Sequence, residues 1–155
     1  METVKKILAP TDLSELSLIG VRHALEMGRS QGAEVVVYYV IDLGGQWFRR
    51  REGIGPVHEM LERHKRMLDG FLRDKFPELM NLVEVRQVVE LGATAHNLIV
   101  KKAESEGVER IVMSTHGRTG ITHLLMGSVS EKVVARAPCP VLVMPAHKRD
   151  IAKAA

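Results

Sequence analysis

The chain has 155 residues, a formal net charge of +3, and 45% apolar and 26% charged residues. These values are typical of a single globular domain with a sizeable core. Acidic residues nearly match the basic ones, so the charge does not favour a nucleic-acid-binding protein. One cysteine excludes an internal disulfide. The lack of a signal peptide or of an apolar run long enough to span a bilayer predicts a cytoplasmic protein with no membrane partner.

The first elements are predicted from short apolar runs and the residues that interrupt them. Val4–Ala9 is a short buried strand that Pro10 is expected to end. Asp12 or Ser14 is then expected to cap a helix, because both side chains are typical of N-caps. Gly32 marks the end of that helix.

The middle of the chain continues the alternation of strand and helix. Glu34–Ile41 is almost entirely Val and Tyr, as expected for a central strand of a parallel sheet. Asp42–Gly55 has little pattern and is predicted to be a loop. Val57–Phe76 carries apolar residues on one side and is predicted to be a helix that Pro77 ends. Leu82–Glu90 alternates valines with charged residues, which is typical of an edge strand.

The remaining elements complete a βαβαβαβαβ order. We expect a helix at Ala95–Glu106 closed by Gly107, a strand at Glu109–Met113, a helix at Val129–Arg136 and a strand at Val141–Met144. This order favours an α/β fold with one doubly wound parallel sheet and helices on both faces. Residues 1–147 are expected to form this single domain, and residues 148–155 a frayed tail.

The segment after the fourth strand has the features of a phosphate cradle. Ser114, Gly117 and Gly120 lie in a small-residue loop, and Gly127-Ser128 opens the next helix. Glycines let backbone amides approach a ligand, and a helix N-terminus supplies unpaired N–H groups with a partial positive charge. The segment is neither a P-loop nor a dinucleotide-binding fingerprint, because both glycine–lysine and G-x-G-x-x-G patterns are absent.

The predicted topology points to the same region. A doubly wound sheet binds its ligand outside the carboxyl ends of the strands, where the strand order reverses. Four segments are therefore candidate walls of a site: Pro10–Asp12, Val40–Asp42, Leu91-Gly92 and Ser114–Gly117.

These residues resemble the adenine-nucleotide-binding branch of the universal stress proteins. The resemblance covers nearly the whole chain and rests on ILAPTDLSELS, VVVYYVID and STHGRTGITHLLMGSVSEKVVARAPCPVLVMP. The family motif is G-x-x-G, nine residues, then G-[S/T], and it falls on Ser114, Gly117, Gly127 and Ser128. The first motif glycine is thus replaced by Ser114, which adds a hydroxyl and suits a positive φ less well.

The resemblance implies a set of nucleotide-binding residues. They are Pro10, Thr11, Asp12, Val40, Met113, Ser114, His116, Gly117, Arg118, Gly127, Ser128, Val129 and Ser130. In this assignment Asp12 hydrogen-bonds the adenosine and Val40 contacts adenine. The glycine loop and the helix start hold the phosphates through N–H and hydroxyl groups.

The resemblance also implies a fold, a ligand and an assembly. The fold is a five-stranded Rossmann-like sheet of order 3-2-1-4-5, similar to adenine nucleotide alpha hydrolases. The ligand is ATP, AMP or ADP, with Mg or Mn if a triphosphate binds, in a stress-response protein. The assembly is a homodimer in which Val141–Met144 pairs with its copy, which would cover an apolar sheet edge.

Simpler interpretations of the same residues remain open. Asp12, Ser128 and Ser130 also suit helix capping, and Arg118 suits a solvated surface position. The seven histidines show no metal-ligand spacing, and Cys139 between two prolines is typical of a packed turn. The aromatic and arginine residues at 47–51 are too few to indicate a nucleic-acid-binding face.

Catalysis is a separate question. The sequence offers no catalytic residues, and without a dedicated lysine it predicts at most slow ATP hydrolysis. The alternative function is an interaction module of the same family that binds no nucleotide. An electron-transferring or adenylating enzyme would rest on fold analogy alone.

Overall fold

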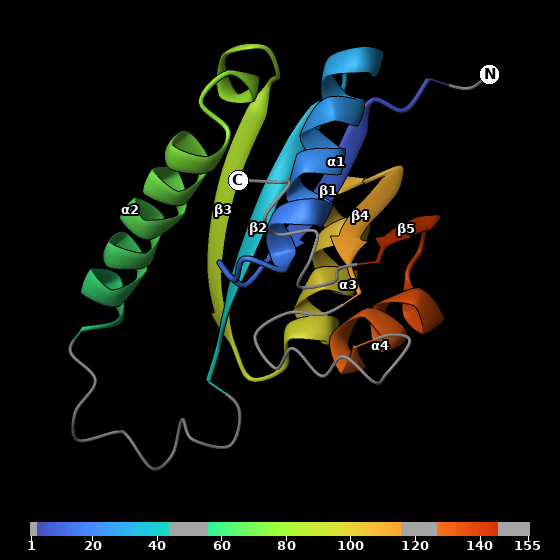
Figure 1. Ribbon diagram of the computed structural model, residues 1–155. Coiled ribbons are helices and arrows are strands. Elements are labelled where there is room, and N and C mark those ends of the chain that lie inside the picture. The colour runs from blue at the N-terminus through green and yellow to red at the C-terminus, as the bar shows by residue number, and fades with distance from the viewer. Residues whose placement is uncertain (1–2, 44–55, 116–126, 146–155) are drawn as a thin grey trace.

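The computed structural model describes residues 3–43, 56–115 and 127–145 (Figure 1). Five parallel strands form one sheet in the order β3-β2-β1-β4-β5, as predicted. The elements are β1 (Lys6–Thr11), α1 (Ser17–Gln31), β2 (Glu34–Asp42), α2 (Val57–Lys75), the 3-10 turn η2 (Leu79–Asn81), β3 (Val85–Gly92), α3 (Ala95–Glu106), β4 (Arg110–Ser114), α4 (Ser128–Arg136) and β5 (Val141–Met144).

The core has two layers, one on each face of the sheet. Side chains of α1 and α2 form one buried cluster with alternate residues of β1 and β2, including Ala9 and Tyr39. Side chains of α3 and α4 form the other with the intervening residues, including Leu8 and Tyr38. This alternation explains why β2 is apolar at nearly every position, since both of its faces are covered. None of the helices in the described ranges is long and apolar enough to cross a membrane.

The predicted end of the first strand is wrong, and the reason bears on the site. Pro10 lies inside β1, where it pairs in register with Tyr38 of β2. On its other side β1 pairs with β4 only at Ile7 and Leu8. The missing N–H of Pro10 therefore falls beyond that pairing, where a proline costs little. Because β1 and β4 separate there, a crevice opens at the carboxyl end of the sheet.

The end of α1 follows the sequence prediction, and at its start one of the two predicted capping residues, Ser14, bonds the helix although Leu16 occupies the N-cap position. Gly32 closes α1 with a left-handed φ of 67°, and Gly107 closes α3 with a φ of 62°. At the start of α1, Asp12 accepts a hydrogen bond from the backbone of Ser14 rather than from the helix. Ser14 Oγ is the oxygen that accepts the N–H of Ser17, the first residue of the helix, at 3.2 Å.

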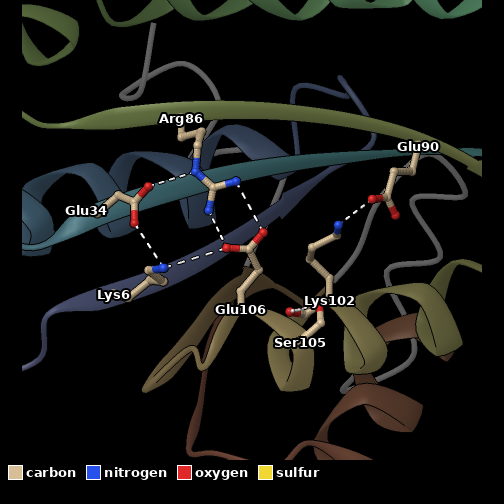
Figure 2. Close-up of polar contacts among 7 residues, drawn as sticks. All are labelled: Lys6, Glu34, Arg86, Glu90, Lys102, Ser105 and Glu106. Carbon is tan, nitrogen blue, oxygen red and sulfur yellow. Dashed lines mark hydrogen bonds and ion pairs between the residues drawn. The ribbon is translucent and has the colours of Figure 1, made fainter.

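Charged side chains join three strands and a helix at the amino end of the sheet (Figure 2). Arg86 Nε donates to Glu34 Oε1 at 2.8 Å, and its two terminal nitrogens donate to the carboxylate of Glu106. Lys6 Nζ lies 3.4 Å from Glu34 and 3.7 Å from Glu106. Hydrogen bonds from Arg86 hold the pKa of both glutamates below its ordinary value, and the two carboxylates raise the pKa of Arg86.

Arg86→Met should make the protein less stable at neutral pH and less sensitive to acid. The folded pKa values of Glu34 and Glu106 are lowered, so their contribution is present above about pH 4.3 and is lost as pH falls through the folded values. Because the network is partly exposed, we expect a loss of about 1 kcal/mol at pH 7 that shrinks below about pH 4. Urea unfolding across this range measures it.

Arg73→Met is the matched control, because Arg73 pairs with one exposed carboxylate of its own helix, Asp69, at 2.9 Å. Its expected cost is about 0.3–0.5 kcal/mol. Equal effects of the two variants at every pH would show that the network does not stabilise the amino end of the sheet.

Candidate functional site

A cavity of about 410 Å³ lies at the carboxyl end of the sheet, where β1 and β4 separate. Its size is typical of a small-molecule site. The strand order also reverses at this point, because β2 follows β1 on one side and β4 lies on the other. The cavity therefore occupies the position where doubly wound folds bind their ligands.

The cavity brings together every predicted site residue that the structure describes. All ten line its wall: Pro10, Thr11, Asp12, Val40, Met113, Ser114, Gly127, Ser128, Val129 and Ser130. They come from four segments that are far apart in the sequence. The other three predicted residues, His116, Gly117 and Arg118, lie outside the described residues.

The loop from β1 to α1 is held by its own side chains. Thr11 Oγ1 accepts the N–H of Leu13 at 3.1 Å and shares a hydrogen bond with Ser17 Oγ at 2.8 Å. Asp12 Oδ1 accepts the N–H of Ser14 at 2.9 Å. These bonds support Leu13 in the left-handed region, with a φ of 63°, which is uncommon for leucine. The loop therefore fixes the position of the Asp12 carboxylate in the cavity wall.

Ser114, which replaces the first motif glycine, fits the site without backbone strain. Leu13 is the only non-glycine residue with a positive φ in the described ranges, so the backbone of Ser114 is that of an ordinary strand residue. Its buried Oγ accepts the N–H of Gly20 at 2.9 Å. The hydroxyl thus connects the end of β4 to α1, a role that the sequence did not reveal.

The start of α4 combines internal hydrogen bonds with donors available to a ligand. Gly127 N and Ser130 Oγ both donate to the carbonyl of Thr115, at 2.6 and 2.8 Å. The first intrahelical bond runs from Glu131 N to Gly127 O, so the amides of residues 128, 129 and 130 precede it.

This geometry revises the donors expected at the phosphate end of the site. The Gly127 amide and the Ser130 hydroxyl hold the turn between β4 and α4 rather than facing a ligand. The three following amides and the Ser128 hydroxyl remain, at the positive end of a nine-residue helix. These groups suit an anion such as a phosphate.

Comparison with known proteins agrees with this architecture. A family model described as "Universal stress protein family" matches residues 3–145. The chain belongs to the universal stress protein family. Universal stress protein MJ0531 of Methanocaldococcus jannaschii is 32% identical over 159 aligned residues, covering 94% of this chain and 85% of the relative. Universal stress protein MJ0577 of the same organism is 31% identical, covering 90% and 94% of the two chains.

Solved structures of universal stress proteins share the fold. The structure of MJ0577 superposes with a TM-score of 0.75 at 30% identity, covering 95% of this chain and 99% of that one. A universal stress protein solved in complex with cAMP superposes with a TM-score of 0.66, covering 93% and 98% of the two chains. At 15% identity it supports the fold alone.

The cavity of this universal stress protein has further lining residues, most of which sequence reasoning missed. The additional lining residues are Ser17, Tyr38, Tyr39, Ile41, Asp42, His64, Met67, Ala95, Ile99 and Thr115. Ile41, Asp42 and Thr115 lie within the predicted walls Val40–Asp42 and Ser114–Gly117, whereas the predicted wall Leu91-Gly92 does not line the cavity. The contributions of α2 and α3 depend on how these helices pack, which has no local sequence signal. Among the described residues, no group of three or more His, Cys, Asp or Glu could hold a metal ion.

Tyr38 forms a rigid part of the cavity wall. Its hydroxyl donates to Glu90 Oε2 at 2.6 Å, and Lys102 both binds Glu90 and lies 5.5 Å from the centre of the Tyr38 ring. Burial and the neighbouring Glu90 carboxylate raise the pKa of Tyr38, so its phenol stays protonated. Glu90 therefore holds the Tyr38 ring through its hydroxyl, and Lys102 contacts its face.

Proposed function

We propose that this universal stress protein binds an adenine nucleotide, either ATP, ADP or AMP, in the cavity at the carboxyl end of the sheet. One observation carries the proposal: the ten described residues of the predicted set line a single cavity at the switch point of the strand order. The phosphates would bind at the start of α4, and Asp12 would accept hydrogen bonds from the ribose hydroxyls.

The same lining supports a regulatory rather than a catalytic role. Phosphoryl transfer needs charge neutralisation and a positioned base or water, and the described part of the cavity wall contains no lysine or arginine. Mg or Mn would be held chiefly through the phosphates of a bound triphosphate, as is common for Mg²⁺. Hydrolysis would be slow at most, and bound nucleotide would act by favouring one conformation or partner.

A homodimer is part of the proposal. Strand β5 lies at one edge of the sheet and pairs with β4 on its other side. Its residue Leu142 is 36% exposed, although the strand is entirely apolar. Pairing of Val141–Met144 with a second copy would cover this edge.

Thermal unfolding with and without nucleotide tests the binding proposal. A ligand at about 100 times its dissociation constant adds about 2.7 kcal/mol of stability. For a domain of this size, we expect the melting temperature to rise by roughly 5–10 °C with ATP and Mg²⁺. Tripolyphosphate at the same concentration is the control, and it should give a smaller rise because it lacks the adenosine. Absence of a shift with ATP, ADP and AMP would instead support the interaction module that binds no nucleotide.

A further inference from the structure

The cavity extends well beyond the phosphate end. From the start of α4 it passes over the ends of β1 and β2 and reaches α2, where His64 and Met67 line it. Val40 and Ile41 of β2, whose side chains lie on opposite faces of the sheet, both contribute to the wall. The walls at α2 and α4 therefore lie on opposite faces of the sheet, and the cavity crosses the strand ends between them.

The hydrogen bonding of His64 defines the chemistry at this end. His64 Nδ1 lies 2.7 Å from the backbone oxygen of Met60, one turn earlier in α2. A carbonyl oxygen only accepts, so Nδ1 must carry the proton, and in the neutral ring Nε2 is then an acceptor.

Contacts with neighbouring residues also restrict the orientation of the His64 ring. Its centroid lies 5.7 Å from that of the Tyr39 ring, with 45° between the planes, and the side chain is half-buried. Tyr39 itself is buried in the core beneath α1 and α2. The His64 ring, which lines the cavity, therefore has little freedom to turn.

The proposed phosphate site at α4 sets the direction in which a nucleotide would lie. With its phosphates at the amides of α4, the nucleotide would place its base beyond β1, toward β2 and α2. We propose that His64 Nε2 accepts a hydrogen bond from the exocyclic amino group of the base, which makes His64 a specificity-determining residue that selects aminopurines over oxopurines. This inference rests on the proposed function, since it assumes that a nucleotide occupies the cavity.

Comparison of ATP with ITP tests the inference, because ITP replaces the amino group by a carbonyl oxygen and keeps the ribose and phosphates. The wild-type protein should bind ATP about ten times more tightly than ITP, as measured by titration calorimetry. His64→Phe keeps a ring against Tyr39 but removes the acceptor, so it should weaken ATP binding and bring the ATP/ITP ratio close to one. His64→Gln restores an acceptor and should recover part of the ratio.

His58→Phe is the matched control, because His58 lies on the exposed surface of the same helix and outside the cavity wall. It should leave the ratio at its wild-type value. An unchanged ratio in His64→Phe, or a wild-type protein that binds ATP and ITP equally, would overturn the inference and leave the proposed function standing. A wild-type protein that binds no nucleotide would overturn both.

Discussion

Gly127→Val should weaken ATP binding at least ~100-fold while leaving the protein folded. The Val side chain would project at the start of α4, where the amides of residues 128–130 are the donors for phosphate. Loss of two charge-assisted hydrogen bonds of about 1.5 kcal/mol each corresponds to roughly a 100-fold change in affinity. Equilibrium dialysis or calorimetry with ATP and Mg²⁺ measures the loss.

The fold should tolerate this change because Gly127 has an extended backbone. Its φ is −72° and its ψ is 160°, a region that valine adopts readily, and it bonds its neighbours only through its own N–H and carbonyl, which valine retains. Loss of a favourable N-cap residue should cost about 1 kcal/mol of unfolding free energy. Gly127→Ala, with a smaller side chain, should give an intermediate affinity. Unchanged affinity for ATP in the Val variant would show that the start of α4 does not bind the phosphates.

The fold was predictable because its signals are local. Apolar strand-length runs alternate with helical segments, and Gly32 and Gly107 end their helices as their positions in the sequence indicate. The bounds of α3 and β5 agree with the prediction. Strand β3 begins at Val85 rather than at Leu82, because the chain is still turning out of the 3-10 turn η2 there, with the Leu82 N–H bonded to the Leu79 carbonyl.

The site was predictable only where it is made of strand ends and helix starts. The ten described residues could be proposed because the family resemblance implies them, and topology independently places the strand ends Pro10–Asp12, Val40 and Ser114 together. His64 could not, because it sits in the middle of α2 and reaches the cavity only through the packing of that helix on the sheet. The hydroxyl of Ser114 likewise gained its role from a contact with α1 that spans 94 residues of sequence.

Gly20 of α1 donates that hydrogen bond, and its surroundings show how closely α1 approaches the end of β4. A Cβ atom at position 20 would lie 2.6 Å from Ser114 N and 2.8 Å from the carbonyl carbon of Met113. Both are backbone atoms, so a side-chain rotation could not relieve the clash. The sequence alone does not show that a methyl group would not fit at this position.

Gly20→Ala should therefore destabilise the protein, although alanine is the better helix former. Overpacking of this kind typically costs about 1–3 kcal/mol, and the gain of about 1 kcal/mol in helix propensity offsets only part of it. Because the clashes are with backbone atoms, the upper part of this range applies, and we expect a net loss of about 1–2 kcal/mol in urea unfolding and a larger loss for Gly20→Val. Because Met113 and Ser114 line the cavity, displacement of β4 should also weaken nucleotide binding.

Gly70→Ala supplies the control, since a Cβ atom there meets nothing within 4 Å and the residue lies in the exposed part of α2. The same substitution should stabilise the protein at this position by about 0.5–1 kcal/mol. Opposite signs at the two glycines would separate the steric effect of close helix–strand packing from the general effect of alanine on helices. Stabilisation by both variants would mean that α1 moves away from β4 at little cost, and Ser114 would then not hold the two elements together.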